Sequence, residues 1–317
     1  MKNKLTTCAI LASLGAITIH LINRSIIELA SISNLLNPTE GNYYEWRFGK
    51  IYYKKQGEGS PILLVHDLNA HSSGYEWKKA ASILAANHTV YVIDLLGCGR
   101  SDKPNLTYTN FLYVQMINDF ISNVIGEKTD VIATGESASF VIMACNTGED
   151  TINRIAMVNP LSFTELTKGP DKRSRILKFL IEIPIIGTML YNMLQSKECT
   201  EDVFREKYFF NAGKIDDTTI NAYNEAAHKN HCRSKYLFAS IKGLYTKANI
   251  FNCIGNLTNS IFIVSGSDDP GNNEITGQYK KYVPAIESVM ISDTKHLPQM
   301  ENPKEFCEQI SVLFDIE

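Results

Sequence analysis

The chain has 317 residues, of which 44% are hydrophobic, and it carries a formal net charge of −3 at pH 7. This length suits a single α/β core with one large insertion, and the slightly acidic balance gives no electrostatic basis for binding nucleic acid. The seven cysteines are scattered, with neither a C-x-x-C pair nor a histidine at metal-ligand spacing. We therefore predict free thiols, without a disulfide framework and without a metal site.

The N-terminal segment is predicted to lie outside the globular fold. Residues 5–22 are uncharged and, at roughly 18 residues, about as long as the shortest segments that span a bilayer. No clear small-x-small cleavage site follows, which disfavours a cleaved signal peptide. We predict that residues 1–38 hold an uncleaved anchor that attaches the protein to a membrane, on a side that the sequence leaves open. A signal peptide of a secreted protein and a buried helix of a cytoplasmic one are the alternatives.

From residue 43 onward, short apolar runs alternate with helical patterns. The runs at 44–48 and 51–55, separated by Gly49-Lys50, predict an antiparallel hairpin. Later runs are mostly apolar, as in strands buried on both faces of a parallel sheet, and lie at 61–66, 90–94, 131–134, 154–158, 260–266 and 288–291. Helices are expected between these runs, with a last one over 303–314. The alternation predicts an α/β fold with a mostly parallel sheet and helices on both faces.

The strand pattern stops between residues 161 and 248. This segment opens with a charged patch from Lys168 to Arg175, and its periodicity is helical throughout. We predict that residues 161–248 form an inserted helical cap, called the cap segment below. Residues 43–160 and 249–317 then form the α/β core.

The cap segment contains an evenly apolar stretch over 176–194, which Pro184 and Gly187 should divide into two short helices. Two interpretations of its apolar residues are open. They bury one another against the core, or part of their surface lines a dry substrate pocket or meets the bilayer beside the anchor. The candidate pocket residues in this stretch are Phe179, Ile183 and Ile186.

The stretch 130–146 joins a β-branched strand directly to a helix of small and apolar residues, and Ser137 lies between them. Such a turn strains the backbone of its central residue, so small neighbours are needed two positions before and after it, here Gly135 and Ser139. The turn lifts the serine hydroxyl above the sheet and points the helix N-terminus at it, which stabilises developing negative charge. Ser137 is therefore a candidate nucleophile. An ordinary strand–loop–helix junction with a capping serine has the same pattern.

Four motifs in register resemble those of the α/β-hydrolase fold serine hydrolases, and the resemblance extends from residue 43 to the C-terminus. They are the D-x-x-G-x-G-x-S-x-x-P loop at 94–104, the nucleophile elbow at 135–139, the acid loop at 266–270 and the histidine loop at 296–303. The order Ser, Asp, His is also the order of that family. The resemblance implies the α/β-hydrolase fold with an inserted cap.

A serine nucleophile needs an imidazole base, and the imidazole needs an acid that fixes its tautomer. His296 follows the last strand, where a loop can reach back over the turn at Ser137. By resemblance the acid is Asp269, with Asp268 as the adjacent alternative. The N–H groups of Leu68 and Ala138 would form the oxyanion hole. No organic cofactor is implied.

The chain departs from the family beside this site. The usual His-Gly pair is His66-Asp67, and Ser139 stands where glycine is usual. A carboxylate ~6 Å from the oxyanion would oppose it by about 3 kcal/mol at an effective dielectric of ~20, roughly a hundredfold in rate. Asp67 should therefore point away from the oxyanion, or catalysis should be weak. His66, Asp67 and Glu136 are the polar residues expected in the pocket.

These features predict a serine hydrolase that cleaves a carboxylic ester or a related acyl bond of a small, apolar substrate. Two other functions fit the same residues: a weakly active or inert hydrolase-fold protein that binds a small molecule or partner, and an acyltransferase with the same triad. Serine instead of aspartate at position 137 argues against the dehalogenase and epoxide-hydrolase relatives of the family.

Overall fold

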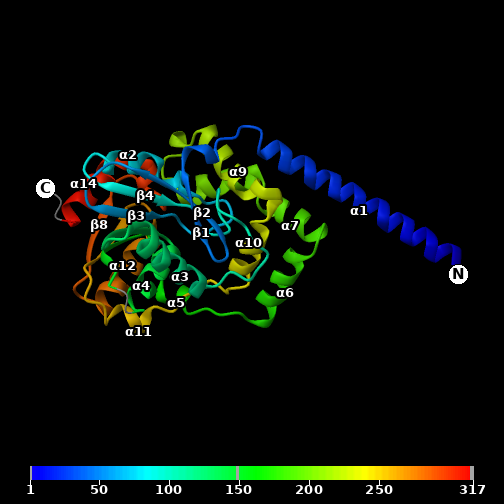
Figure 1. Ribbon diagram of the computed structural model, residues 1–317. Helices are drawn as coiled ribbons and strands as arrows, with labels where there is room; N and C mark the ends of the chain where they lie inside the picture. The colour runs from blue at the N-terminus through cyan, green and yellow to red at the C-terminus, as the bar shows by residue number, and fades with distance from the viewer. Residues whose placement is uncertain (1, 148–149, 315–317) are drawn as a thin grey trace.

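The computed structural model describes residues 2–147 and 150–314, and this part of the chain contains one eight-stranded sheet (Figure 1). The strands are β1 (Asn42–Trp46), β2 (Gly49–Gln56), β3 (Pro61–Val65), β4 (Thr89–Ile93), β5 (Thr129–Thr134), β6 (Ile152–Val158), β7 (Ile261–Gly266) and β8 (Glu287–Ile291). Their order across the sheet is β1-β2-β4-β3-β5-β6-β7-β8. The pairs β1–β2 and β2–β4 are antiparallel, and all other neighbours are parallel. The predicted hairpin and mostly parallel sheet are confirmed.

The helices lie between and after these strands. They are α1 (Lys2–Ala30), α2 (Lys78–Leu84), α3 (Asn110–Phe120), α4 (Ser137–Cys145), α5 (Phe163–Leu166), α6 (Lys172–Glu182), α7 (Ile186–Leu194), α8 (Lys197–Val203), α9 (Asp217–Cys232), α10 (Lys235–Lys242), α11 (Phe251–Ile254), α12 (Pro270–Tyr282), α13 (Pro298–Glu301) and α14 (Pro303–Leu313). Single 3₁₀ or π turns are η1 (Pro38–Glu40), η2 (Gly74–Trp77), η3 (Ile121–Ile125), η4 (Phe204–Tyr208) and η5 (Ala212–Lys214).

Helices cover both faces of the sheet, as the alternating sequence predicts. Helices α3 and α4 pack on one face, where Tyr113, Phe120 and Phe140 are fully buried. Helices α2 and α14 pack on the other face, around Trp77 and Phe306 (Figure 1). All five residues of β3 are buried because the strand lies inside the sheet with a helical layer on each side, which explains why its sequence is wholly apolar and does not alternate.

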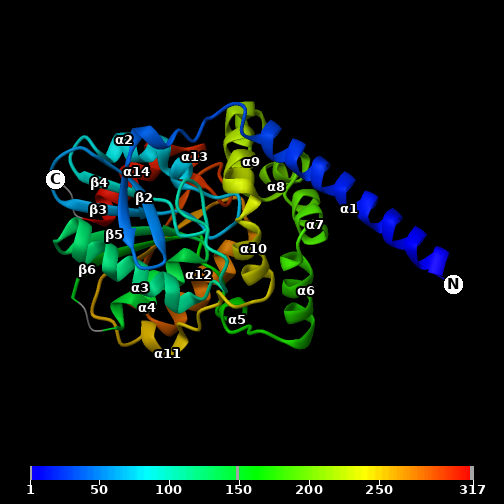
Figure 2. The ribbon, with the colours of Figure 1, turned by 45° about the vertical axis from the view of Figure 1, so that its right-hand side comes forward.

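The cap segment contains α5 to α10, which follow β6, and α6, α7, α9 and α10 gather beside one end of the sheet (Figure 2). The predicted division of its apolar stretch is confirmed, because α6 ends at Glu182 and α7 begins at Ile186. A Cβ at Gly187 would lie 2.3 Å from the main-chain oxygen of Ile181, so the sharp turn between the two helices requires a glycine there.

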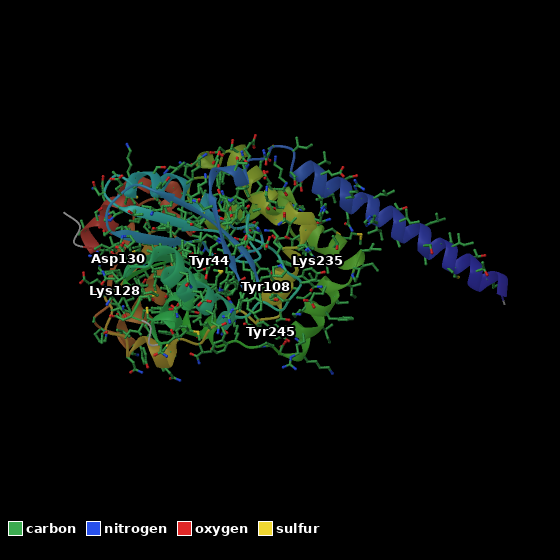
Figure 3. All side chains as sticks on the ribbon, in the orientation of Figure 1. Tyr44, Tyr108, Lys128, Asp130, Lys235 and Tyr245 are labelled. Carbon is green, nitrogen blue, oxygen red and sulfur yellow. The ribbon has the colours of Figure 1, made fainter. Side chains whose placement is uncertain are left out.

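Helix α1 leaves the globular part of the molecule beside the cap segment, and the side chains of its outer half stand clear of the rest of the chain (Figure 3). Its last turns pack against α7 and α9. The side-chain amide of Asn23, which is buried, donates to the main-chain oxygen of Ile185 at 3.0 Å and accepts from Asn192 at 2.9 Å. Within the described residues, α1 is the one unbent helix that is long and apolar enough to cross a membrane, and 6% of its apolar window is buried.

The loop after β4 is built on a buried ion pair. Arg100 donates to the carboxylate of Asp94 through Nε at 2.7 Å and Nη2 at 2.8 Å, and the N–H of Gly74 adds a third hydrogen bond at 2.6 Å. Burial opposes ionisation of Asp94, but the charge of Arg100 outweighs it and lowers the pKa of the carboxyl to about 2. A Cβ at Gly99 would lie 2.3 Å from Oδ2 of Asp94. The aspartate and this glycine of the motif therefore have a structural role, which is to fix the loop beside β3.

Asp94→Ala should cost about 3–5 kcal/mol of the free energy of unfolding, because it leaves the guanidinium of Arg100 buried without its partner. The matched control is Glu40→Ala, which breaks the exposed Lys54–Glu40 pair and should cost less than about 1 kcal/mol. Urea unfolding of both variants measures the difference. Equal losses would contradict the structural role of Asp94.

Candidate active site

Gly135 occupies the sharp turn between β5 and α4. Strand β5 ends at Thr134, and α4 begins at Ser137. Gly135 has φ +57°, the left-handed conformation that costs glycine nothing and is strained for other residues. A Cβ at this position would lie 2.2 Å from Oδ1 of Asp67. The Asp67 carboxylate therefore fills the space that a side chain at position 135 would occupy.

Ser137 lies two residues beyond the turn, in the first turn of α4. Its side chain is fully buried, and its hydroxyl donates to the main-chain oxygen of His66 at 2.7 Å. This hydrogen bond ties the elbow helix to the end of β3. The structure does not bring Ser137 into hydrogen-bond contact with His296, whose Nε2 contacts Asp67.

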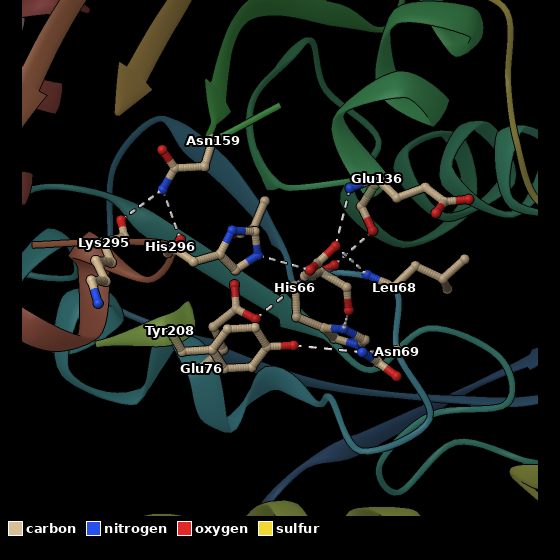
Figure 4. Close-up of polar contacts among 12 residues, drawn as sticks. His66, Leu68, Asn69, Glu76, Glu136, Asn159, Tyr208, Lys295 and His296 are labelled. Carbon is tan, nitrogen blue, oxygen red and sulfur yellow. Dashed lines mark hydrogen bonds and ion pairs between the residues drawn. The ribbon is translucent and has the colours of Figure 1, made fainter. Parts of the chain in front are cut away.

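Asp67 is the centre of a polar cluster, and its partners Leu68, Glu136 and His296 are labelled in Figure 4. Its Oδ1 accepts hydrogen bonds from the N–H of Leu68 at 2.8 Å and from the N–H of Glu136 at 3.0 Å. Its Oδ2 lies 3.0 Å from Nε2 of His296. Both side chains keep some contact with solvent, with 15% of Asp67 and 18% of His296 exposed. Asp67 thus points toward the N–H groups of Leu68 and Glu136. The expectation from the sequence that its side chain points away is wrong.

The two N–H groups that hold Oδ1 come from the two loops that carry the oxyanion donors in a nucleophile elbow. In such an elbow the donors are the N–H of the residue after the nucleophile and an N–H from the loop after the third strand. The resemblance implied Leu68 and Ala138, and in the structure Leu68 and Glu136 share one acceptor. The residue with the left-handed conformation of the turn is Gly135, two residues before Ser137. The oxyanion donors stay a prediction.

Asp67 and His296 form a tightly coupled ionic pair. Burial opposes the charge on Asp67, but the hydrogen bond and charge of His296, with the two N–H donors, outweigh it and lower the pKa of the carboxyl. Burial likewise opposes the charge on His296, but the hydrogen bond and charge of Asp67 prevail and raise the pKa of the imidazole. The pair therefore favours a carboxylate facing an imidazolium.

Glu76 is a second buried carboxyl next to Asp67. Its Oε2 accepts the main-chain N–H of Asp67 at 3.2 Å, and its Oε1 accepts from Gln299 at 2.8 Å. The same Gln299 amide donates to the hydroxyl of Thr134 at 3.1 Å. Burial first, and then the charge of Asp67, raises the pKa of Glu76 to about 7. The Glu76 contacts fix the backbone of Asp67 to the end of β5 and to α13.

Two further histidines support the loop that carries Asp67. His66 accepts the N–H of Leu95 at Nε2 and donates from Nδ1 to the main-chain oxygen of Asp67, and burial lowers its pKa. His71 contacts the hydroxyl of Tyr208 at 3.1 Å, and burial lowers its pKa to about 4. The ring of Tyr208, from the cap segment, stacks on His296 with centroids 5.1 Å apart. His66 thus supports the loop that carries Asp67. The cap segment covers His296 through the ring of Tyr208.

The two carboxylates predicted as the acid of the triad, Asp269 and Asp268, have other hydrogen-bond partners. The carboxylate of Asp269 caps α12 by accepting the N–H of Gly271 at 3.0 Å, and Asp268 accepts from the hydroxyl of Ser267. Within the described part of the chain neither carboxylate has a hydrogen bond to His296. The charge of Asp269 raises the pKa of His296 less than the charges of Asp67 and Glu76 do. Asp269 as the catalytic acid stays a prediction that this arrangement does not support.

The residues expected in the substrate pocket separate into two groups. Glu136 is buried, and its carboxylate pairs with Nζ of Lys247 at 2.7 Å. Its contact with Asp67 is made by its main-chain N–H. Phe179 and Ile186 are 65% and 59% exposed on the outer side of the cap segment, and Ile183 is half-buried in the turn between α6 and α7. Because their side chains are exposed, Phe179 and Ile186 do not line a buried pocket. The apolar stretch that carries them is more exposed than its composition suggested.

The sequence reasoning missed Gly135 and Glu76. A signal for Gly135 existed, since Ala133 and Ser137 are also small residues two positions before and after it, so the elbow rule fits both registers. Glu76 had no comparable signal, because only folding brings the turn after β3 to Gln299 in α13. In the described part of the chain, no cluster of three or more His, Cys, Asp or Glu side chains is arranged to hold a metal ion.

Comparison with known proteins places the fold and motifs in a family. Residues 62–309 match the alpha/beta hydrolase family, so the chain belongs to that family. It is a hydrolase-fold enzyme, and the structures it resembles include both serine hydrolases and epoxide hydrolases. The predicted family and fold are confirmed.

The chain is similar to an epoxide hydrolase, CorEH, with a TM-score of 0.71 and 16% identity, covering 87% of this chain and 98% of that one. It is also similar to a serine hydrolase involved in carbazole degradation, with a TM-score of 0.68 and 18% identity over 87% and 99% of the two chains. At these identities the likeness concerns the fold.

Two curated relatives match by sequence. A 2-hydroxy-6-oxo-6-(2'-aminophenyl)hexa-2,4-dienoic acid hydrolase of Metapseudomonas resinovorans is 35% identical over 71 residues, which cover 22% of this chain and 24% of that protein. The soluble epoxide hydrolase of Corynebacterium sp. (strain C12) is 26% identical over 110 residues, or 35% of this chain and 38% of that one. The matches thus span about a quarter and about two fifths of these relatives.

The raised pKa of Glu76 makes stability depend on pH. A carboxyl that titrates near 4.5 when unfolded and at about 7 when folded adds stability at low pH that is lost as the pH rises through this window. The full loss is about 3 kcal/mol. His296, whose pKa is also raised from 6.5, contributes slope only above 6.5. His71, whose pKa burial lowers from 6.5 to about 4, contributes a rise in the same window, so the native slope is a sum of opposing contributions. Glu76→Gln should therefore make the slope of the unfolding free energy against pH more positive than that of the native protein between pH 4.5 and 6.5, measured by urea unfolding. An unchanged slope would contradict the assignment to Glu76.

Proposed function

We propose that this protein hydrolyses a small molecule with Asp67 as the nucleophile and His296 as the acid and base. The observation that carries the proposal is the position of the Asp67 carboxylate. One oxygen lies between the N–H groups of Leu68 and Glu136, and the other faces Nε2 of His296. A nucleophile of this fold stands beside the imidazole and next to the oxyanion donors. Here Asp67 enters that place from the loop after β3, and Gly135 leaves room for it.

The first step forms an alkyl ester on Asp67. Oδ2 attacks a saturated, electrophilic carbon of the substrate, and the bond from that carbon to its leaving oxygen breaks. The imidazolium of His296 gives its Nε2 proton to the departing oxygen, which becomes a hydroxyl, and the neutral imidazole remains. The raised pKa of His296 suits it to begin as the acid.

The second step hydrolyses the ester and restores the site. The neutral His296 takes a proton from a water molecule, whose oxygen adds to Cγ of Asp67. The negative charge of the tetrahedral intermediate develops on Oδ1, which already accepts the N–H groups of Leu68 and Glu136. The intermediate collapses by breaking the bond between Cγ and the alkyl oxygen, which takes the proton of the hydroxyl added from water, and the product leaves as an alcohol. Asp67 is again ionised and His296 is again protonated.

This chemistry selects the class of substrate. A carboxylate that attacks an acyl carbon would form an anhydride, whereas attack on a saturated carbon forms a more stable ester. An epoxide supplies a strained saturated carbon whose leaving oxygen stays on the product, and the net reaction consumes one water to give a diol. Epoxides are therefore the first substrates to test, and similarity to epoxide hydrolases supports this choice.

A second candidate is the ester hydrolysis predicted from the sequence, with Ser137, His296 and Asp269 as the triad and a small apolar acyl substrate. Its support is the G-x-S-x-S motif and the similarity to serine hydrolases. It requires the hydroxyl of Ser137 to break its hydrogen bond to His66 and to move to His296. An acyltransferase would need the same movement.

The two candidates differ in where the oxygen of water goes. During repeated turnover of epoxides in water enriched in the heavy oxygen isotope, the Asp67 mechanism places heavy oxygen in the Asp67 carboxylate, detected by mass spectrometry of the peptide. Asp67→Asn should lower the rate by roughly 10³-fold or more, and Asp269→Asn should change it little. Heavy oxygen absent from the peptide, with Asp269→Asn as damaging as Asp67→Asn, would favour Ser137. No turnover of epoxides or of acetyl, butyryl and octanoyl esters would favour a binding protein.

A paired substitution tests the assignment of the turn. Asp67→Gly with Gly135→Ser removes the carboxylate and places a hydroxyl on the turn residue, beside the two oxyanion donors. A serine-directed fluorophosphonate should label the paired variant at position 135 and leave Ser137 of the native protein unlabelled. Asp67→Gly alone is the control. Adduct mapping to Ser137 in the native protein would reject the assignment of Gly135 to the nucleophile position.

We also propose that residues 5–22 anchor the protein to a membrane. The support is the exposure of the apolar side chains along this part of α1, among them Ile10, Leu14 and Ile17, which contact nothing in the globular part. Leaving such a helix in water costs free energy that a bilayer removes.

A further inference from the structure

The outer face of α6 and α7 carries apolar side chains that no other part of the described chain covers. Among the exposed ones are Ile176, Phe179, Leu180, Ile186, Met193 and Leu194, and these six are called the cap face below. Phe179 and Met193 are more than 60% exposed. Helix α6 and the helical segment Ile186–Tyr208, which begins with α7, are together apolar enough to resemble a membrane segment, but they are bent by 106° and so cannot cross as one straight helix. A bent apolar pair of this kind can lie within the surface of a bilayer.

Cations border the cap face where α6 begins. Lys168, Lys172, Arg173 and Arg175 are all exposed, and Asp171 is the one carboxylate among them. The side chain of Asp171 is used as the cap of α6, where it accepts the N–H of Ser174. The patch therefore has a net positive charge. Such a patch next to an apolar face attracts the anionic headgroups of phospholipids.

Helix α1 determines where a bilayer would lie. The residues from 5 to 22 project from the globular part, and Asn23 is the first buried side chain of the helix. At 1.5 Å per residue this projecting part is about 27 Å long, close to the thickness of the hydrocarbon core. A membrane crossed by residues 5–22 would thus end near Asn23.

Asn23 is bonded directly to the cap segment. It contacts the main-chain oxygen of Ile185, in the turn between α6 and α7, and the side chain of Asn192 in α7. Figure 2 shows α6 along the edge of the globular part from which α1 departs. The edge of the membrane and the cap face therefore fall at the same place on the molecule.

We infer that the cap face lies in the surface of the bilayer that α1 crosses, with Lys172, Arg173 and Arg175 on its anionic headgroups. This inference rests on the proposed membrane anchor and adds a second contact to it. The occupant of the cap face is lipid. The cap segment, whose Tyr208 stacks on His296, would then be in direct contact with the membrane.

The test uses the full chain reconstituted in vesicles of phosphatidylcholine and phosphatidylglycerol with brominated acyl chains, which quench tryptophan fluorescence on contact. The two native tryptophans, Trp46 and Trp77, are buried in the α/β core and give a constant background. Phe179→Trp reports on the cap face, and Leu14→Trp reports on the anchor. The matched control is Val312→Trp, which is 69% exposed. Its helix, α14, lies at the end of the molecule away from α1 (Figure 1).

We expect strong quenching of the tryptophans introduced at 14 and 179 and none at 312. Adding Lys172→Glu, Arg173→Glu and Arg175→Glu should reduce quenching at 179 by roughly twofold or more and leave that at 14 unchanged. Quenching at 14 alone would overturn the lipid contact of the cap face and keep the anchor. Quenching at none of the three would reject both. Equal quenching at all three would show unspecific adsorption and would also overturn the inference.

Discussion

The site depends on a single carboxylate whose two oxygens are both fully used. Oδ1 of Asp67 accepts hydrogen bonds from the N–H groups of Leu68 and Glu136, and Oδ2 contacts Nε2 of His296. A partly buried charge is tolerated only with such partners, because an unpaired carboxylate in this position would lose its hydration without compensation. Glu76 and His66 in turn hold the backbone of Asp67.

Two departures from the usual hydrolase pattern explain each other. Asp67 stands where the family has glycine, and Gly135 stands at the strained turn where a nucleophile would project. Taken alone, a carboxylate near an oxyanion hole would repel the developing charge. In the structure the carboxylate occupies the donors itself, and the missing side chain of Gly135 provides the volume it needs. The electrostatic conflict inferred from the sequence thus becomes an attraction between a carboxylate and two N–H dipoles.

The cap segment links the site to the N-terminal helix. Tyr208 extends from the cap segment onto His296, while α7 and α9 hold the end of α1 on the other side. The buried pair Asn23–Asn192 makes this junction specific, because two amides removed from water need each other or a main-chain partner. The end of α1 is therefore docked on the cap segment.

The sequence by itself determined the sheet, its mostly parallel order, the division of the cap stretch at Pro184 and Gly187, and the family, because periodicity, helix breakers and ordered motifs are local properties. It also drew attention to His296, Leu68 and the unusual Asp67, which contact one another in the structure. Only the tertiary structure decided which residue occupies the turn after β5, since small residues satisfy the elbow rule in two registers. It likewise brought Glu76 and Gln299 together and left Asp269 apart from His296. Contacts between segments so distant in the chain depend on how loops close over the sheet, which no local pattern encodes.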